Sequence, residues 1–272
     1  MFELLTDYHT HTFRCGHATG TLRDYVESAI SKGIDEIGLT DHLFLYFEHP
    51  EKRDTRWAMP EEWYGTHYAE MLEVRNEYRD RINVRVSVEA DYVRGSEQAL
   101  RKTLSSYAFD FVLGSVHFMD DWLIDDPDQA HRYSLEDVSS IYRRYYERLR
   151  EAVELGEFDL LAHFDLPKKF GFLPEGDLTS LVGETLDAVR DHDIAIEVST
   201  AGLRKPVGEI YPSLAILREM RIREIPIALS SDAHDPHDVG AGYDQSVPFV
   251  RAAGYESVVV FDQRERREVR LG

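Results

Sequence analysis

Asp7-Tyr8-His9-Thr10-His11 is the stretch on which the interpretation of the fold depends. It lies at the end of a segment, residues 4–9, that we predict to be a β-strand. Because side chains alternate between the two faces of a strand, His9 and His11 lie on the same face. Two neutral imidazoles aimed at one point form half of a site for a first-row transition metal. Two solvated histidines near the N-terminus are the alternative, and the rest of the chain decides between them.

Further strand-like segments follow, separated by helical patterns. The predicted strands are residues 4–9, 36–40, 83–89, 109–116, 159–162, 194–198 and 227–230. Strands that alternate with helices indicate a parallel sheet. In a closed barrel all strand ends meet at one rim, whereas a doubly wound open sheet brings together only one or two of them. Since His, Asp or Glu ends nearly every predicted strand, we expect an α/β barrel formed as a single domain by residues 1–272.

Capping signals place the helices between these strands. Thr21 is predicted to cap the first helix, and Gly33 to end it. Ser134 is predicted to cap a long helix that ends at Gly156. Residues 43–59 form an excursion that mixes aromatic and charged side chains, which suits a lid or specificity loop at a barrel mouth.

The composition excludes several classes of protein. No apolar run approaches the length of a membrane-spanning helix and no signal peptide is visible, so we expect a cytoplasmic protein without a membrane partner. The single Cys15 cannot form an intramolecular disulfide, in agreement with a reducing compartment. The formal net charge of −20 repels nucleic acid. Residues 264–270 interleave arginines with acids and are expected to form a solvated tail or a final helix.

Nine side chains at or just after the predicted strand ends are candidate metal ligands. They are His9, His11, His17, His42, Glu89, His117, His163, Asp232 and His234. One tetrahedral ion takes about four ligands, so nine suit two or three ions with positions left open. Imidazole and carboxylate ligands without thiolate favour Zn, Fe or Mn.

Each candidate has a structural alternative. Glu89 could instead pair with Arg85 or Arg94, His17 could be a plain loop residue, and His163 could end its strand without touching a metal. The five remaining histidines have no strand-end placement and are expected to be surface or helix residues. They are His49, His67, His131, His192 and His237.

Four motifs, in this order along the chain, resemble the PHP (polymerase and histidinol phosphatase) superfamily. They are His9-Thr10-His11 with His17; Thr40-Asp41-His42; Glu89 followed by Gly114-Ser115-Val116-His117; and Asp232-Ala233-His234. Residues 163–166 and 197–205 resemble its monofunctional histidinol-phosphatase branch. This resemblance implies a distorted (β/α)7 barrel and hydrolysis of L-histidinol phosphate to L-histidinol and phosphate in histidine biosynthesis.

The resemblance also implies how the ligands are grouped. One ion would take His9, His11, Glu89 and Asp232; a second Glu89, His117 and His163; a third His17, His42 and His234. For the mechanism we expect a hydroxide that bridges two ions to attack phosphorus, since metal ligation lowers the pKa of water to about 7.

Roles in catalysis and substrate binding follow from these positions. The residues assigned to catalysis are Glu89, Arg204, Asp232 and His234, and those assigned to phosphate binding are Lys168, Lys169 and Arg204. Asp41 and Asp165 are expected to orient ligand imidazoles. The cationic end of the substrate is expected to meet acids and aromatics of the 43–59 excursion, such as Phe47, Glu48 and Trp57.

Three other functions stay open at this point. A phosphodiesterase or nuclease of the same superfamily is disfavoured by the acidic chain, which has no basic groove. A phosphotyrosine phosphatase of the same fold would differ in its substrate. A non-catalytic metal-binding module is disfavoured by the complete set of ligands. The oligomeric state is not predicted.

Overall fold

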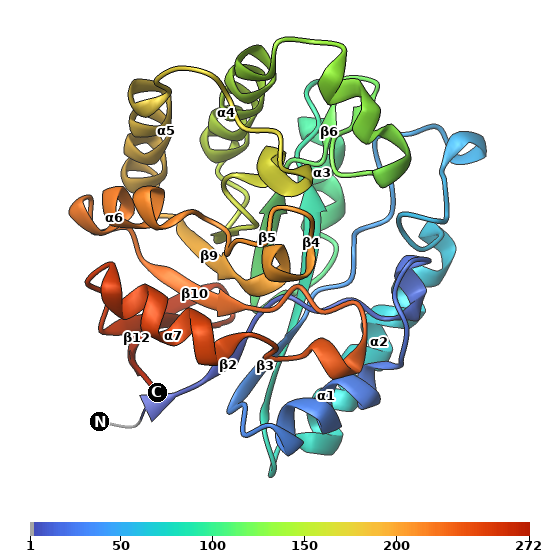
Figure 1. The fold of residues 1–272 in the computed structure, drawn as a ribbon. Helices are drawn as coiled ribbons and strands as arrows, with labels where there is room; N and C mark the ends of the chain where they lie inside the picture. The colour runs from blue at the N-terminus through green and yellow to red at the C-terminus, as the bar shows by residue number, and fades with distance from the viewer. Residues whose placement is uncertain (1–2) are drawn as a thin grey trace.

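Seven parallel strands form the central sheet, as the computed structural model of residues 3–272 shows (Figure 1). Their order, β10-β9-β8-β5-β4-β3-β2, follows the chain without reversal, so the predicted barrel is confirmed and the doubly wound alternative is wrong. The strands are β2 (Thr6–Asp7), β3 (Glu36–Leu39), β4 (Asn83–Asp91), β5 (Phe111–Ser115), β8 (Leu160–Leu161), β9 (Ala195–Ser199) and β10 (Ile227–Ser230). Residues 1 and 2 of the predicted domain lie outside the described part of the chain.

Hydrogen bonds between the segments that end β2 and β10 bring the two edges of the sheet together. The backbone N–H of Tyr8 donates to the carbonyl of Leu229 (3.2 Å), and that of His11 donates to the carbonyl of Ala233 (2.8 Å). The buried Asp7 carboxylate adds side-chain bonds, since it accepts from the backbone N–H and the hydroxyl of Ser231 (2.8 and 2.5 Å). Asp7 therefore helps to close the barrel.

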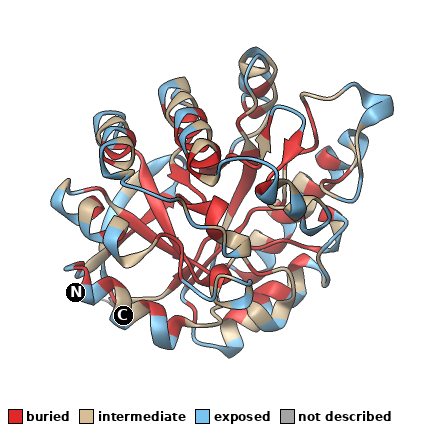
Figure 2. Cartoon of the chain, turned by 45° about the horizontal axis from the view of Figure 1, so that its top comes forward, coloured by how far each residue is buried: buried red, intermediate tan, exposed pale blue. Residues whose placement is uncertain are grey.

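Helices surround the sheet and bury one face each against it (Figures 1 and 2). They are α1 (Leu22–Ser31), α2 (Glu61–Tyr78), α3 (Glu97–Leu104), α4 (Val138–Leu155), α5 (Thr179–Asp191), α6 (Leu214–Ile222) and α7 (Tyr243–Ala252). Short 3-10 turns occupy much of the connecting loops: η1 (Phe13–Cys15), η2 (Pro50–Lys52), η3 (Pro127–Ser134), η4 (Leu166–Phe170), η5 (Thr200–Arg204) and η6 (Pro236–Asp238). Within residues 3–272, no helix combines the length and apolar character needed to cross a membrane.

The capping predictions are confirmed except at one helix. Thr21 accepts from the backbone of Asp24 in a capping box, and Gly33 follows the last residues of α1 with φ of 71°. The prediction for Ser134 is wrong, because Ser134 ends η3 and α4 begins only at Val138. Asp137 caps α4 instead, since its carboxylate accepts from the backbone N–H of Ser140 (2.9 Å).

The C-terminal run forms a strand, so the prediction of a tail or helix for residues 264–270 is wrong. Strand β12 (Glu265–Leu271) pairs antiparallel with β11 (Ser257–Asp262) and parallel with β1 (Glu3–Leu4). Val269 and Leu271 alternate with charged residues, which is the period of a strand with one solvated face. The predicted first strand, residues 4–9, is therefore divided between β1 and the barrel strand β2.

Two layers of apolar side chains lie on either side of the barrel wall. Strand residues such as Val112 and Leu161 face the helices. Residues next to these along the strands, such as Phe111 and Leu160, point the other way and form a separate interior cluster. Tyr8, which follows β2, and Phe261 of strand β11 belong to the same cluster. Phe261 packs against Phe111 at a ring-centroid distance of 5.4 Å. The filled interior fixes the strands, and the polar strand ends are left at the rim.

Candidate metal centre

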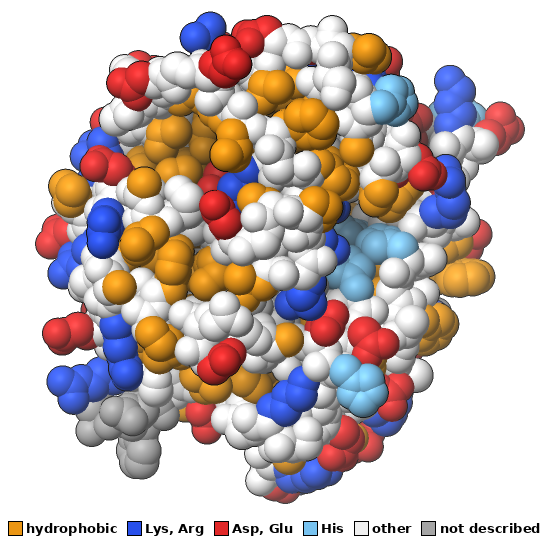
Figure 3. Space-filling model, in the orientation of Figure 1, with side chains coloured by type: hydrophobic (Ala, Val, Ile, Leu, Met, Phe, Trp, Pro, Cys, Tyr) orange, Lys and Arg blue, Asp and Glu red, His pale blue; other side chains and the backbone are white. Residues whose placement is uncertain are grey.

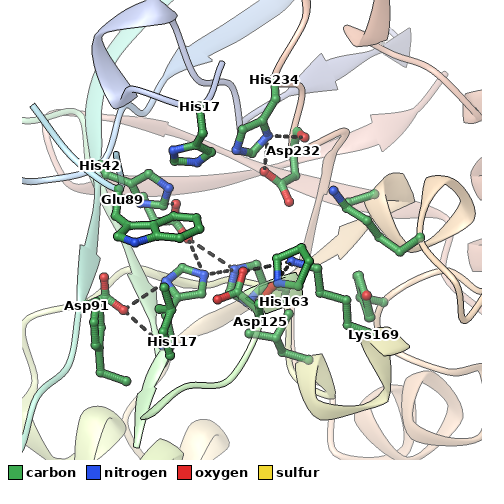
Figure 4. A pocket seen from close by; sticks show the side chains of 18 of the residues that line it. His17, His42, Glu89, Asp91, His117, Asp125, His163, Lys169, Asp232 and His234 are labelled. Atoms are coloured by element: carbon green, nitrogen blue, oxygen red, sulfur yellow. Dashed lines mark hydrogen bonds and ion pairs between the residues drawn. The ribbon is translucent and has the colours of Figure 1, made fainter. Parts of the chain in front are cut away.

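The nine predicted ligands come together at the carboxyl ends of the barrel strands. His9 and His11 follow β2, His42 follows β3, Glu89 lies in β4, and the others follow η1, β5, β8 and β10. Seven of the nine line one pocket, whose side chains Figure 4 shows. His9 and His11 are not among the residues that line it, and both are fully buried.

Glu89 lies at the centre of the cluster. Its Oε2 is 3.1 Å from His9 Nε2, 3.3 Å from His11 Nε2 and 3.0 Å from His42 Nδ1. Its Oε1 is 3.2 Å from His163 Nε2 and 3.7 Å from His117 Nε2. One buried carboxylate therefore contacts imidazoles that follow four different strands, a position suited to a bridging ligand.

Asp232 forms the second acidic centre, on the other side of the histidine pair. Its Oδ1 lies 3.4 Å from His11 Nε2, 3.7 Å from His9 Nε2 and 3.4 Å from His234 Nδ1. The Asp232 and His234 pair thus approaches the His9 and His11 pair from the opposite edge of the sheet, where the barrel closes.

The candidate ligand atoms lie close together but do not satisfy one another with hydrogen bonds, as expected for atoms that bind a metal ion. His9 Nε2, His11 Nε2 and Glu89 Oε2 are buried and have no hydrogen-bond partner within the described chain. Such orphaned polar atoms are costly unless something satisfies them. Two ligands that are each about 2.1 Å from one tetrahedral ion lie about 3.4 Å apart. The separations of 3.0–3.7 Å around Glu89 and Asp232 are close to that spacing.

Five groups of described residues could each hold an ion, with their ligand atoms within 4.8 Å of one another. Three of them resemble the expected grouping: His9, His11 and Asp232; Glu89, His117 and His163; His11, His42 and His234. The other two differ from it: His11, Cys15 and Asp41; His42, Asp91 and His117. His11 takes the place expected for His17 in the third group. The His17 ring centroid lies 4.9 Å from that of His234 and 5.4 Å from that of His42, so His17 borders this group.

The candidate ligands differ in their pKa values. Burial lowers the pKa of His11 to about 4, and it also lowers the pKa of His17 and of His234. Burial opposes ionisation of Glu89 and Asp232, but the surrounding histidines outweigh it and hold both pKa values well below their ordinary range. His11, His17 and His234 therefore offer free imidazole lone pairs at neutral pH. At His9, His42 and His117 the neighbouring carboxylates outweigh burial and raise the pKa, that of His117 to about 10, so a proton competes with an ion for these three rings.

Two candidate ligands hold a backbone conformation that is rare for residues other than glycine. His163 has φ of 34° and Asp232 has φ of 49°. Such strain persists where the surroundings impose it, and it concentrates at functional sites. Glu197 Oε1 accepts from the backbone N–H of His163 (2.8 Å), and the Arg204 guanidinium donates to the carbonyl of Asp232 (3.2 Å).

Sequence reasoning gave no role to several residues that support the cluster. The fully buried Glu197 lies with Oε2 3.0 Å from His9 Nδ1, and Asp91 lies 2.9 Å from His117 Nδ1. Both carboxylates fix the ring whose other nitrogen faces Glu89. An acid in the middle of the buried run Ala195-Ile196-Glu197-Val198 was the available signal for Glu197.

Asp41 and His67 form a second buried network. The Asp41 carboxylate accepts from Thr12 N (2.6 Å) and Cys15 Sγ (2.8 Å), and it lies 2.9 Å from His67 Nε2. Asp41 therefore holds the loop that follows His11, and it acts on that ring only through Cys15, whose Sγ is 3.5 Å from His11 Nδ1. His67 lies on α2 as expected for a helix residue, but it is fully buried and not at the surface.

Asp165 does not orient a ligand imidazole as expected. Its carboxylate pairs with Lys168 (2.9 Å) and accepts from the backbone N–H of Ser213 (2.9 Å). These contacts hold η4 against the segment that precedes α6. The expectation for Asp165 fails because its neighbours in space come from parts of the chain that are remote in sequence.

The structure does not bring two of the expected phosphate-binding cations to the pocket surface. Lys168 is buried, with its Nζ 3.2 Å from Glu209 and 2.8 Å from the carbonyl of Ile210. Arg204 donates to the carbonyl of Ser231 (2.6 Å) and pairs with Asp238 (3.2 Å). Lys169 does line the pocket, where it pairs with Asp125 (3.0 Å; Figure 4), and Lys205 lines it too.

The pocket is hollowed into one face of the molecule, and Figure 3 shows histidine side chains in that hollow. Its cavity has a volume of about 360 Å³. The apolar wall above the histidines is made by Leu43, Leu45, Trp57, Phe118, Leu123, Leu166 and Tyr211. Trp57 thus lies where the 43–59 excursion was expected to contribute, while Phe47 packs on Phe118 (4.9 Å between ring centroids).

A seven-stranded α/β barrel with a histidine-rich rim is the architecture expected from the sequence motifs. Comparison with known families gives the same result. The chain belongs to the PHP domain family, whose model matches residues 7–201. The resemblance inferred from the motifs is thereby confirmed.

Curated relatives point to one branch of this family. The chain is 38% identical over 254 residues to a "Probable histidinol-phosphatase" of Deinococcus radiodurans, covering 93% of this chain and 95% of the relative. It is 28% identical to the histidinol-phosphatase of Bacillus subtilis, covering 88% and 96%. A crystal structure of histidinol phosphate phosphatase from Lactococcus lactis, complexed with Zn, L-histidinol and phosphate, has the same fold, with a TM-score of 0.81 at 19% identity over 97% of this chain and 98% of that one.

Proposed function

We propose that this protein is a metal-dependent phosphomonoesterase that hydrolyses L-histidinol phosphate to L-histidinol and phosphate. One observation carries the proposal: the ligand atoms of His9, His11 and Glu89 are buried, lack hydrogen-bond partners within residues 3–272 and face one another at ligand spacing. The similarity to histidinol-phosphatases over nearly the whole chain supports the choice of substrate.

Two or three Zn, Fe or Mn ions would be held by the nine candidate ligands. Bound there, such ions supply positive charge for the phosphoryl oxygens and lower the pKa of water at the site. The Lactococcus lactis relative was crystallised with Zn, which supports a divalent transition metal here. The donor set, seven imidazoles and two carboxylates, is the chemistry such ions prefer.

The chain's own side chains preorganise the centre. Glu197 and Asp91 fix the rings of His9 and His117, so those ligands need little reorganisation when an ion binds. Arg204 supports catalysis by holding the carbonyl of Asp232, and not by contacting phosphate. Glu89 contacts histidines on both sides of the cluster and would be one of the residues that hold the ions.

The rest of the pocket suits the organic part of the substrate. L-Histidinol phosphate carries an ammonium group and an imidazole beside its phosphate. The aromatic rings of Trp57, Phe118 and Tyr211 would enclose the imidazole. Asp125 also lines the pocket, but its carboxylate already pairs with Lys169 (3.0 Å).

A phosphate-release screen tests the proposal. The panel holds L-histidinol phosphate, a phosphotyrosine peptide, p-nitrophenyl phosphate and its bis-ester, each assayed with and without a chelator. We expect the highest kcat/KM for L-histidinol phosphate, loss of activity with the chelator and recovery when metal is returned. Faster hydrolysis of the bis-ester would indicate a phosphodiesterase, and a preference for the peptide would indicate a phosphotyrosine phosphatase. Either result would overturn the proposal.

A further inference from the structure

Four cations, Lys168, Lys169, Arg204 and Lys205, follow β8 and β9 close to the metal centre. Three of them already have a carboxylate partner. Asp165 and Glu209 hold Lys168, Asp125 holds Lys169, and Asp238 holds Arg204. These ion pairs leave little positive charge to offer to a ligand.

Lys205 differs from the other three. It lines the pocket, yet within residues 3–272 its ammonium forms neither an ion pair nor a hydrogen bond. The loop that carries it is well fixed, because Ser199 and Tyr211 exchange backbone hydrogen bonds at its base (2.7 and 2.9 Å). At Gly202 a Cβ would lie 1.9 Å from the carbonyl oxygen of Glu209, which shows how closely the loop is packed. A fixed loop thus presents an unpaired cation to the pocket.

The surroundings of Lys205 favour an anionic ligand. Burial lowers the pKa of its ammonium, so part of its hydration is already lost. The acidic side chains that face it, Asp232 and Asp125, are engaged elsewhere, the first with the histidines and the second with Lys169. A partly desolvated ammonium gains more from an anion than an exposed one does.

We propose that Lys205 binds a non-bridging oxygen of the substrate's phosphoryl group. The inference rests on the proposed phosphomonoesterase function and names the residue that recognises the anion. A phosphomonoester dianion offers three such oxygens, whereas a diester offers only two and carries less charge. Lys205 therefore also favours monoesters over diesters. The net charge of −20 alone does not provide this selectivity.

The test compares Lys205→Ala with Lys205→Arg in the metal-loaded enzyme, with p-nitrophenyl phosphate as substrate and inorganic phosphate as inhibitor. Loss of a charged hydrogen bond corresponds to about 10- to 100-fold in binding. We expect Lys205→Ala to raise both the KM and the inhibition constant of phosphate by that factor, with metal content unchanged. Lys205→Arg should recover most of the loss. The matched control is Lys102→Ala, an exposed lysine of α3, which should leave both constants unchanged.

The outcomes separate this inference from the proposed function. If KM and phosphate inhibition in Lys205→Ala stay within twofold of wild type, the inference is overturned, whatever the preferred substrate is. If L-histidinol phosphate is not preferred but Lys205→Ala still weakens phosphate binding, only the substrate assignment fails. Should no ester be hydrolysed, calorimetric titration of the metal-loaded protein with inorganic phosphate still decides, because unchanged affinity in Lys205→Ala contradicts the inference.

Discussion

Glu89 is the residue whose environment says most about the centre. Its carboxylate is buried, its two oxygens lie among the rings of five histidines, and Ser115 donates a hydrogen bond to Oε1. Without a cation between them, the unpaired Oε2 and the facing Nε2 atoms would each cost free energy. Metal ions bound between these atoms would satisfy them and remove this cost.

Asp232→Asn provides the first residue-scale prediction. The change keeps the size of the side chain but removes the negative charge that faces His9 and His11. We expect turnover of L-histidinol phosphate to fall by at least about a thousandfold, because a ligand that fixes charge at the reacting centre is lost. The measurement is kcat with purified variant, beside circular dichroism to show that the fold is kept.

The matched control for Asp232→Asn is Asp244→Asn, an exposed acid at the start of α7. It should keep wild-type kcat. A well-folded Asp232→Asn protein that retains more than a tenth of wild-type activity would remove Asp232 from the centre.

At the scale of elements, local sequence patterns predicted well where the strands end, but they predicted poorly which charged side chains form ion pairs. Strand ends are marked by the residues themselves, so His42, Glu89 and His117 were placed correctly at the rim. The partners of a charged side chain come from distant segments: Arg204 meets Asp238, and Lys168 meets Glu209. No local pattern distinguishes a cation that is paired in this way from one that is free to bind a ligand.

The ion pairs of α4 give a pH-dependent prediction at the element scale. Glu151 accepts hydrogen bonds from Arg94 in the loop after β4 and from Arg148 on the same helix (2.9 Å). Burial opposes ionisation of Glu151, but the two guanidinium groups outweigh it and lower the pKa below the ordinary 4.5. A lowered folded-state pKa means that the stabilisation is present above pH 4.5 and disappears as the pH falls through the folded-state value.

We therefore expect Glu151→Gln to lower the free energy of unfolding by about 0.5–1 kcal/mol at pH 7, and by progressively less as the pH falls below 4.5. Denaturant titrations of both proteins at pH 7, 5 and 3 measure the difference. Glu154→Gln, an exposed position on the same helix, serves as the control and should be neutral throughout. A difference that grows on acidification would show that the sign is wrong.

At the scale of the whole molecule, the site exists because the barrel closes. Asp232 and His234 meet His9 and His11 only where the two edge strands, β2 and β10, come together. The order of the strands and the rim could be predicted from the sequence, since both follow from periodic patterns. Strand β12 could not, because its charged residues hid the alternation of Val269 and Leu271.

Substitution of Asp7 tests how much its carboxylate contributes to closing the barrel between β2 and β10. Its carboxylate accepts from both Ser231 groups and from the backbone N–H of Gly240 (2.8 Å), which are all contributed by the segment after β10. Asp7→Ala leaves these buried donors unsatisfied, so we expect the free energy of unfolding to fall by at least about 3 kcal/mol. Guanidinium denaturation in the presence of a chelator measures it, free of metal effects.

Asp80→Ala is the control for Asp7→Ala, because Asp80 is exposed and, among the described residues, its side chain makes only a long ion pair with Arg79 (3.7 Å). It should change stability by less than about 0.5 kcal/mol. If Asp7→Ala costs no more than this control, the barrel closes without the Asp7 carboxylate.

Anomalous X-ray diffraction from crystals of the protein purified with its metals tests the central claim most directly. Data collected at the Zn, Fe and Mn absorption edges locate and identify any bound ions. We expect two or three peaks in the pocket, with His nitrogens and carboxylate oxygens of the nine candidate ligands about 2.0–2.2 Å away. An active protein whose anomalous map has no peak between Glu89 and its surrounding histidines would contradict the claim.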